Sequence, residues 1–105
     1  MSDDRASDAV QDCAQRLKVL SDPTRLSVVR LLMEKPLTVS QLNETLQVEP
    51  TLLSHHLKVL RDAGLVESER SGKSVIYRLG PENARRRRAL DLGCCELSLG
   101  DIDAN

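Results

Sequence analysis

The chain has 105 residues, of which 15 are Lys or Arg and 16 are Asp or Glu, so its formal net charge is −1. This length predicts one domain rather than two. With 40% hydrophobic residues the chain can bury a core, which excludes disorder as its overall state. No stretch has the roughly 18 to 20 apolar residues that a membrane helix needs. The acidic N-terminus also lacks the apolar region of a signal peptide, so we expect a cytoplasmic protein that does not associate with a membrane.

The three cysteines are Cys13, Cys94 and Cys95. Thiols stay reduced in the cytoplasm, and an odd number of cysteines with two of them adjacent is not typical of a disulfide framework. We therefore expect thiols that are free, buried, metal-binding or redox-sensing.

Charge is distributed unevenly along the chain. Acidic residues outnumber basic ones before residue 51 and after residue 88, whereas basic residues are in excess between these positions. A local basic excess is compatible with one face that binds a polyanion. Most of this excess comes from the consecutive arginines Arg85 to Arg88, which face every direction of a helix and are expected to be solvated. Charge alone is therefore weak support for nucleic-acid binding.

The first two predicted elements are helices. Residues 8–20 place apolar side chains at spacings of three and four, which is typical of an amphipathic helix with Cys13 on its apolar side. Asp22 followed by Pro23 favours a second helix start, because Asp caps free amide groups and Pro suits the first helical position. This helix would end at Lys35-Pro36. The two apolar stripes consist of Val10, Cys13, Ala14, Leu17 and Leu20, and of Leu26, Val29, Leu32 and Met33.

A helix-turn-helix is predicted next. Thr38 and Gln41 have the spacing of a capping box, in which each side chain bonds the backbone of the other residue, and a short helix to residue 46 would follow. Glu49-Pro50 opens a further helix that closes at Ala63-Gly64, where Gly suits the left-handed position after a helix. Gln47-Val48 would form the turn between the two helices. The apolar stripe of the second helix contains Leu53, Leu57 and Leu60.

Beyond Gly64 the pattern changes. Residues 65–79, with a Ser71-Gly72 turn, predict a β-hairpin. Gly80-Pro81 is expected to start a last helix, and residues 100–105 to form a frayed tail. The element order predicts a mainly α fold with a small β-hairpin: a winged helix-turn-helix in one domain over residues 1–105, with its core at about residues 8–97. The apolar residues of the last helix would be Ala84, Ala89, Leu90, Leu92 and Leu97.

One side of the helix at residues 50–63 is polar and carries groups suited to DNA. Ser, Thr and neutral His can bond base edges and phosphates in a major groove, and Lys and Arg can contact the DNA backbone. Basic residues also flank the hairpin turn, where a wing would meet the minor groove. A solvated polar face is the simpler interpretation of any single residue, but the ordered set of elements favours DNA. The candidate residues are Thr51, Ser54, His55, Lys58, Arg61, Arg70 and Lys73.

Three motifs give the chain a resemblance to a known family. They are LSDPTRL from Leu20, SHHLKVL from Ser54 together with residues 63–66, and GKSVIYRL from Gly72. In this combination the sequence resembles the ArsR/SmtB repressors over roughly residues 10–97. The resemblance implies a homodimeric winged-helix repressor that binds a palindromic, double-stranded operator and has no permanent cofactor. It also implies a dimer interface made by the terminal helices, and release of DNA when an inducer binds.

Two metal sites of that family are not matched here. Where many members carry a Cys-Val-Cys pair, residues 37–42 read LTVSQL, with hydroxyl groups in place of the thiols. Where others bind zinc at the start of the last helix through an Asp-x-His pair, this chain has Pro81-Glu82-Asn83. His55 and His56 both lie on the predicted recognition helix, so they are expected to face DNA or to be structural rather than to bind metal.

The three cysteines remain as the candidate inducer site. Cys13 on the first helix and the pair Cys94 and Cys95 at the end of the last could converge, within one protomer or between two. Three thiolates without a nitrogen ligand form a soft, trigonal site that suits As(III) or Sb(III) better than tetrahedral Zn²⁺. The adjacent cysteines can share one ion only if Gly93 ends or loosens the helix before them. We therefore expect the repressor to release its operator when As(III) or Sb(III) binds these cysteines.

Other interpretations stay open. The same thiols could form a disulfide or polysulfide that changes DNA affinity, which would make the protein a redox or persulfide sensor. Alternatively, Cys13 is a small buried apolar residue at the dimer interface and the C-terminal pair is incidental. An enzyme is disfavoured, because neither a Gly-rich phosphate loop nor a nucleophile near a histidine is visible in the sequence. A winged-helix module that binds other proteins would show no salt-sensitive binding to DNA.

Overall fold

Four helices form the first part of the chain. The computed structural model describes residues 4–81, 83–86 and 89–99; the predictions for the Arg85 to Arg88 side chains and for the tail at 100–105 lie outside this part. The helices are α1 (Asp4–Val19), α2 (Pro23–Leu32), α3 (Val39–Leu46) and α4 (Pro50–Asp62). α1 begins before its predicted start at residue 8, and the other three helices agree with the sequence to within a few residues.

Side chains fix where α2, α3 and α4 begin. The Asp22 carboxylate accepts a hydrogen bond from the backbone N–H of Arg25 at 3.0 Å, and Pro23 follows it in the first turn. Thr38 with Gln41 forms the predicted capping box. Before α4, the Glu49 carboxylate accepts from a backbone N–H of the first turn at 2.7 Å. Because each of these side chains satisfies an amide that the helix leaves unpaired, the helix starts were readable from the sequence.

The turn between α3 and α4 is held by its own polar groups. Gln47 adopts a left-handed conformation, with a φ of 53°. Its N–H bonds the carbonyl of Asn43 at 2.7 Å. The Asn43 side-chain amide in turn donates to the carbonyl oxygen of Val48. These bonds fix how α4 follows α3, and the predicted helix-turn-helix is therefore present.

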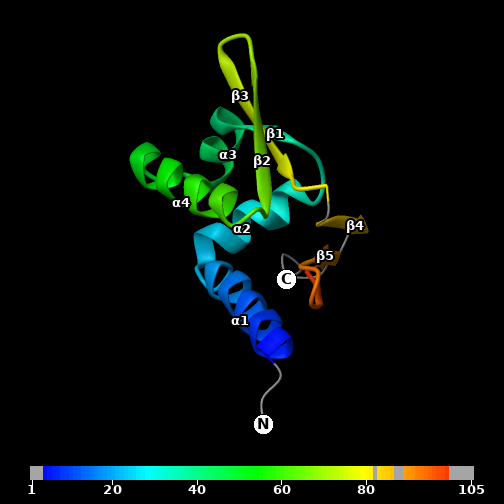
Figure 1. Cartoon of the computed structure of the whole chain (residues 1–105). Coiled ribbons are helices and arrows are strands. Elements are labelled where there is room, and N and C mark those ends of the chain that lie inside the picture. The colour runs from blue at the N-terminus through cyan, green and yellow to red at the C-terminus, as the bar shows by residue number, and fades with distance from the viewer. Residues whose placement is uncertain (1–3, 82, 87–88, 100–105) are drawn as a thin grey trace.

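The predicted hairpin is also present and forms the wing. β2 (Val66–Ser71) and β3 (Ser74–Leu79) pair antiparallel, with Ser71 opposite Ser74. A two-residue strand that was not predicted, β1 (Leu37–Thr38), adds to the other edge of β3, so the sheet order is β1-β3-β2. Figure 1 shows the hairpin projecting from the helices at the end opposite α1.

The predicted last helix is wrong. The described residues after Gly80 form three short strands, β4 (Ala84–Arg86), β5 (Ala89–Asp91) and β6 (Glu96–Ser98), in one antiparallel sheet of order β4-β5-β6. Gly93 has a φ of +87° in the turn between β5 and β6, a value that an α-helix does not contain. Residues 97 and 99 are half-buried while 96 and 98 are exposed, which is the two-residue period of a strand. The half-buried residues are leucines and the exposed ones are polar, so this alternation could be read from the sequence.

The core is aliphatic and joins the helix-turn-helix to both sheets. Leu90 and Leu92 belong to the same cluster as the buried residues of α2 and α4, so β5 and the turn after it are anchored on the helix-turn-helix. Tyr77, the single aromatic residue, is buried at the edge of this cluster. The largest fully buried side chains are Leu42, Leu53, Leu57, Leu60, Leu65, Leu90, Leu92, Val28 and Val29.

α1 is much less covered by the rest of the chain. Val19 and Leu20 at its C-terminal end are buried, whereas Val10 and Leu17 on its apolar side are 66% and 40% exposed. Figure 1 shows the helix extending away from the other three. In the part of the chain that the structure describes, no helix, α1 included, is both long and apolar enough to cross a membrane.

Candidate DNA-binding face and sulfur site

The predicted DNA-facing residues of α4 are all exposed. Leu53, Leu57 and Leu60 are buried in the core on the other side of this helix, whereas Leu52 is 48% exposed. Hydroxyl, imidazole and cationic groups gathered on one helix can bond base edges and phosphates in a major groove. We call these exposed residues the polar face of α4: Thr51, Ser54, His55, Lys58 and Arg61.

The two cations of the polar face already have partners. Lys58 Nζ donates to Asp62 Oδ2 at 2.8 Å, and this bond lowers the pKa of the Asp62 carboxyl from its usual value. Arg61 Nη1 donates to the Tyr77 hydroxyl at 3.3 Å, which links α4 to β3. Lys58 and Asp62 are both exposed, and exposed ion pairs contribute little to stability. Phosphate oxygens could therefore replace the Asp62 carboxylate at small energetic cost.

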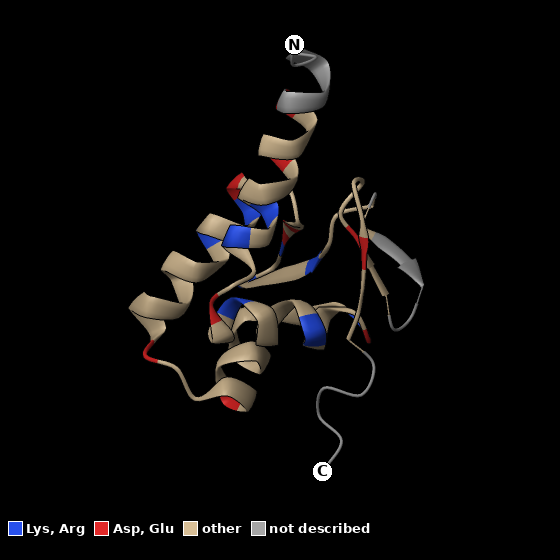
Figure 2. Cartoon of the chain, turned by 90° about the horizontal axis from the view of Figure 1, so that it is seen from below, with Lys and Arg blue, Asp and Glu red and all other residues tan. Residues whose placement is uncertain are grey.

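The wing adds further basic groups. Arg70 and Lys73 are exposed on either side of the Ser71-Gly72 turn. Behind them, Arg78 bonds Glu69 across the two strands at 2.9 Å. Figure 2 shows Lys and Arg positions interspersed with Asp and Glu positions. The cations are thus dispersed between α4 and the wing, in line with a net charge of −1.

The two neighbouring histidines have different surroundings. His55 is exposed, whereas His56 is only 8% exposed. The Nε2 atom of His56 lies 3.8 Å from Asp22 Oδ2. The backbone N–H of Arg25, with a smaller contribution from the charge of His56, lowers the pKa of Asp22. Of the two roles expected for the histidines, the structural one applies to His56, and DNA contact stays a prediction for His55.

The three cysteines come together within one chain, with Cys13 on the helix predicted for it and the other two in a turn where a last helix was predicted. Cys13 lies on α1, and Cys94 and Cys95 lie in the turn between β5 and β6. Their sulfur atoms all lie within 4.8 Å of one another. The Cys13 and Cys95 sulfurs are 4.0 Å apart, and those of Cys94 and Cys95 are 3.9 Å apart. We call these three residues the sulfur site.

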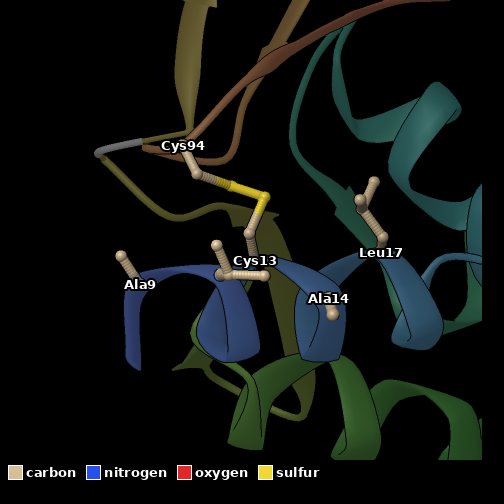
Figure 3. A pocket seen from close by; sticks show the side chains of 6 residues that line it. Ala9, Cys13, Ala14, Leu17 and Cys94 are labelled. Carbon is tan, nitrogen blue, oxygen red and sulfur yellow. A yellow bond between two sulfur atoms is a disulfide. The ribbon is translucent and has the colours of Figure 1, made fainter. Parts of the chain in front are cut away.

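The expectation of reduced thiols is wrong for two of the three. Cys13 and Cys94 form a disulfide whose Cα atoms are 5.9 Å apart, and Cys95 is a half-buried free thiol beside it. Figure 3 shows the bond joining α1 to the turn. Reduction by two electrons and two protons returns both residues to thiols. All three sulfurs can then bind one soft ion, because the thiolate and not the disulfide is the ligand.

An apolar groove runs along α1 next to the disulfide. Its volume is about 380 Å³, and Figure 3 shows the side chains of α1 that line it beside the disulfide. This is the side of α1 that helical spacing predicts to be covered, yet it is open within the single chain. Exposed apolar patches of this kind are typical of surfaces that another molecule covers. The lining residues are Ala9, Val10, Cys13, Ala14, Leu17 and Cys94.

Arg16 belongs to this region although no sequence pattern singled it out. Its Nη1 atom donates a hydrogen bond to the carbonyl oxygen of Leu92 at 2.7 Å, which ties α1 to the turn that holds Cys94 and Cys95. Hydrophobic periodicity does not report polar contacts of this kind. The available signal was its spacing of three residues from Cys13, which places both on neighbouring turns of one helix face.

A wing beside a helix-turn-helix, with an exposed polar face on the second helix, defines a winged helix-turn-helix domain. Residues 22–68 match the family described as "Bacterial regulatory protein, arsR family". Over 102 residues the chain is 31% identical to the arsenical resistance operon repressor of Bacillus subtilis (strain 168). This match covers 96% of this chain and 97% of that protein. The chain therefore belongs to the arsR family, as the three sequence motifs predict.

Two more comparisons show how far the similarity extends. The chain is 40% identical over 73 residues to the HTH-type transcriptional regulator NmtR of Mycobacterium tuberculosis, and the match covers 70% of this chain and 61% of that protein. It therefore spans less than two thirds of this relative's length. A solution structure of the homodimeric winged helix-turn-helix DNA-binding domain of a possible ArsR-family regulator from Mycobacterium bovis gives a TM-score of 0.70 at 28% identity. That match covers 79% of this chain and 77% of the other.

Proposed function

We propose that the protein is a DNA-binding transcriptional repressor that acts in the cytoplasm and releases its operator when As(III) or Sb(III) binds Cys13, Cys94 and Cys95. The observation that carries this proposal is the convergence of three sulfur atoms within 4.8 Å, on a domain whose α4 has an exposed polar face. The Bacillus subtilis relative is named an arsenical resistance operon repressor, which supports arsenic as the class of inducer.

The chemistry of trivalent arsenic suits three thiols. Arsenous acid exchanges its three hydroxyl groups for three thiol sulfurs and releases three waters, so the step involves no oxidation or reduction. The cluster of described ligand groups consists of cysteines alone, whereas structural zinc sites use four ligands. The Cys13–Cys94 disulfide must be reduced first, and a dithiol reductant supplies the two electrons and two protons while becoming a disulfide itself.

Contacts that already exist could transmit inducer binding to α4. Leu92, beside the cysteines, packs in the same core cluster as Leu60 of α4. The N–H of Gly80 bonds the carbonyl of Leu65, the second residue after the α4 C-cap, at 3.0 Å. An inducer that changes how Leu92 and its turn pack on this core would therefore act on the end of α4. The ligand must favour one arrangement over the other for this coupling to work.

The proposal includes a homodimer that covers the α1 groove. A second copy would bury Val10 and Leu17, and two copies would present two α4 helices to a palindromic operator. This interface does not include the last helix predicted from the sequence, because residues 83–86 and 89–99 form strands and turns. The Mycobacterium bovis relative is described as homodimeric, which supports the same assembly here.

Inducer-dependent release tests the sulfur site. Fluorescence anisotropy with the protein's own upstream DNA is measured after reduction with a phosphine, because a thiol reductant would compete for arsenic. We expect As(III) or Sb(III), but not Zn²⁺, to release the DNA. The double variant Cys94→Ser, Cys95→Ser should bind DNA as the wild type does and no longer release it, whereas Ser98→Ala on β6 should behave normally. Normal release by the double variant would remove these cysteines from the inducer site.

A second experiment tests the polar face of α4. Ser54→Ala combined with His55→Ala should weaken operator binding by about tenfold or more, because a good base contact contributes roughly 1 to 3 kcal/mol. Gln15→Ala, an exposed substitution on α1, is the control. Wild-type binding should also weaken steeply as salt is raised, since phosphate contacts release counterions. Unchanged affinity of the double variant, or binding insensitive to salt, would instead favour a winged-helix module that binds another protein.

The Cys13–Cys94 disulfide supports one alternative function, a thiol-based redox or persulfide sensor. In this case two thiols lose two electrons and two protons to an oxidant such as hydrogen peroxide, which becomes two waters, and the new bond changes DNA affinity. The same anisotropy assay separates the candidates. Release by a peroxide or persulfide donor, with no response to As(III), would favour the redox sensor.

A further inference from the structure

Arg16 makes a contact that lies outside the three cysteines of the sulfur site but next to them. Its Nη1 atom donates to the carbonyl oxygen of Leu92 at 2.7 Å, and this bond joins residues 76 positions apart in the chain. Arg16 is half-buried on α1, and Leu92 is 1% exposed. The acceptor is thus a backbone atom of the residue that anchors the cysteine turn in the core. The donor is a cationic guanidinium, so the bond is charge-assisted.

The turn that Arg16 contacts is held by its own hydrogen bonds. The N–H of Leu92 bonds the carbonyl of Cys95 at 2.9 Å, and the N–H of Gly93 bonds Asp91 Oδ1 at 2.7 Å. A Cβ built on Gly93 would lie 3.4 Å from Arg16 Nη1, so the guanidinium passes close over the turn. The positions of Cys94 and Cys95 relative to one another are therefore fixed by the turn. Their position relative to Cys13 needs a link to α1.

The guanidinium also borders a small polar cavity of about 50 Å³, lined by Arg16, Gly64, Asn83, Leu92 and Gly93. Asn83 is 6% exposed, and its side-chain amide donates to the carbonyl of Asp91 at 2.6 Å. Arg16 and Asn83 thus bond two successive carbonyl groups, those of Leu92 and Asp91, next to this cavity. Partial enclosure strengthens such bonds, because fewer waters compete for the acceptor.

We propose that Arg16 is a positioning residue of the sulfur site. Its guanidinium holds the β5–β6 turn against α1 when the Cys13–Cys94 disulfide is reduced, and so it keeps three separate thiols within reach of one trivalent ion. Holding ligands in place before binding lowers the entropy that binding must overcome. The expected effect on As(III) binding rests on the proposed function. The expected effect on the disulfide does not, since the same positioning raises the effective concentration of the Cys13 and Cys94 thiols for each other.

The variant that removes the contact is Arg16→Met, which keeps an unbranched apolar stem. A charge-assisted hydrogen bond of this kind corresponds to about tenfold or more in an equilibrium constant. We expect Arg16→Met to weaken As(III) binding by about tenfold and to shift the Cys13–Cys94 disulfide toward its reduced form by a similar factor. Arg16→Lys, which retains a cationic donor, should recover part of both effects. Lys18→Met removes an exposed cation two residues away on the same helix and should change neither.

The experiment uses the full chain and three readouts. The disulfide is equilibrated in a dithiol redox buffer, As(III) binding is followed by the absorbance of the arsenic–thiolate bonds, and DNA affinity of the reduced protein is measured without inducer. If Arg16 positions the turn, Arg16→Met should change the disulfide equilibrium and As(III) binding, and it should leave DNA affinity unchanged. Wild-type redox equilibrium in Arg16→Met would overturn the proposal. If both Arg16→Met and Arg16→Lys fail to fold, Arg16 is a general structural residue and the proposal is also overturned.

The same data keep this inference apart from the proposed function. If the wild type binds no As(III) while Arg16→Met still shifts the redox equilibrium, the inducer assignment fails and Arg16 keeps its positioning role. If the wild type and Arg16→Met bind As(III) equally and share one redox equilibrium, the inducer assignment stands and the role of Arg16 fails.

Discussion

Asp22 is a single carboxylate with two structural partners. One oxygen accepts from the backbone N–H of Arg25 and caps α2, and the same oxygen lies 3.8 Å from Nε2 of the buried His56 on α4. The other ring nitrogen of His56 is buried and has no hydrogen-bond partner among the described residues. The Asp22 side chain therefore orients the start of α2 and the inner side of α4 together, which links the helix that supports the motif to the helix proposed to meet DNA.

The charge of Asp22 should make stability depend on pH. Its pKa is lowered from 3.8 in the folded chain, first by the bond from the Arg25 backbone. The contribution of the carboxylate is therefore complete above the unfolded value and is lost as pH falls through the folded pKa. Asp22→Asn keeps a capping oxygen but does not titrate, so wild type should be the more stable at pH 7 and lose this advantage well below pH 3.8. Urea unfolding at both pH values measures the difference in free energy of unfolding between the wild type and Asp22→Asn. The same difference at both pH values would exclude the charge of Asp22 as its cause.

Gly80 is a second residue whose identity matters, here because of space. A Cβ at this position would lie 2.7 Å from Asn83 Oδ1 and 2.9 Å from the carbonyl oxygen of Gly64. Gly80→Ala should lower the free energy of unfolding by roughly 1 to 3 kcal/mol, the usual range for overpacking. Because Gly64 follows the C-cap residue of α4, hydrogen exchange at the end of α4 should also speed up. Wild-type stability in denaturant would show that the two neighbours move aside freely.

At the scale of the element, α3 depends on its cap. It has eight residues, and a helix this short has little stability of its own. Thr38 contributes twice: its hydroxyl accepts from the N–H of Gln41 at 3.1 Å, and its backbone belongs to β1, which pairs with β3. The capping box thus joins the first helix of the helix-turn-helix to the base of the wing.

Removing the Thr38 hydroxyl should therefore loosen α3. Thr38→Ala is expected to lower the free energy of unfolding by about 1 kcal/mol, and Thr38→Ser, which restores a capping hydroxyl, should return most of it. Chemical denaturation measures the loss, and hydrogen exchange of the α3 amides localises it. Equal stability of the alanine and serine variants would show that the cap contributes nothing here.

For the whole molecule, we expect another surface to cover the exposed apolar side of α1. Leu17→Glu combined with Val10→Glu would place two carboxylates in the proposed apolar dimer interface, where an unpaired charge is strongly unfavourable. We expect this double variant to sediment as a monomer at concentrations where the wild type is a dimer, and to bind the operator more weakly. Gln15→Glu, on the exposed opposite side of α1, should remain dimeric. A dimeric double variant would place the interface elsewhere.

The helix-turn-helix and the wing could be predicted from the amino-acid sequence. Their signals are local: caps at Asp22 and Thr38, an apolar stripe in α4, and a turn at Ser71-Gly72, each acting over a few residues. The candidate polar face of α4 followed directly, because a buried stripe defines the opposite side of a helix. The arsR-family motifs are local in the same way.

The fold of the described residues after Gly80 and the state of the sulfur site depend on long-range packing. Segment 80–97 contains apolar residues compatible with either a helix or strands, and packing of Leu90 and Leu92 in the core, with Gly93 in a left-handed turn, selects strands. The Cys13–Cys94 bond spans 81 positions, and the Arg16 bond to Leu92 spans 76. Spacing along the chain carries no information about contacts over such separations, because they form only when distant segments pack on one core.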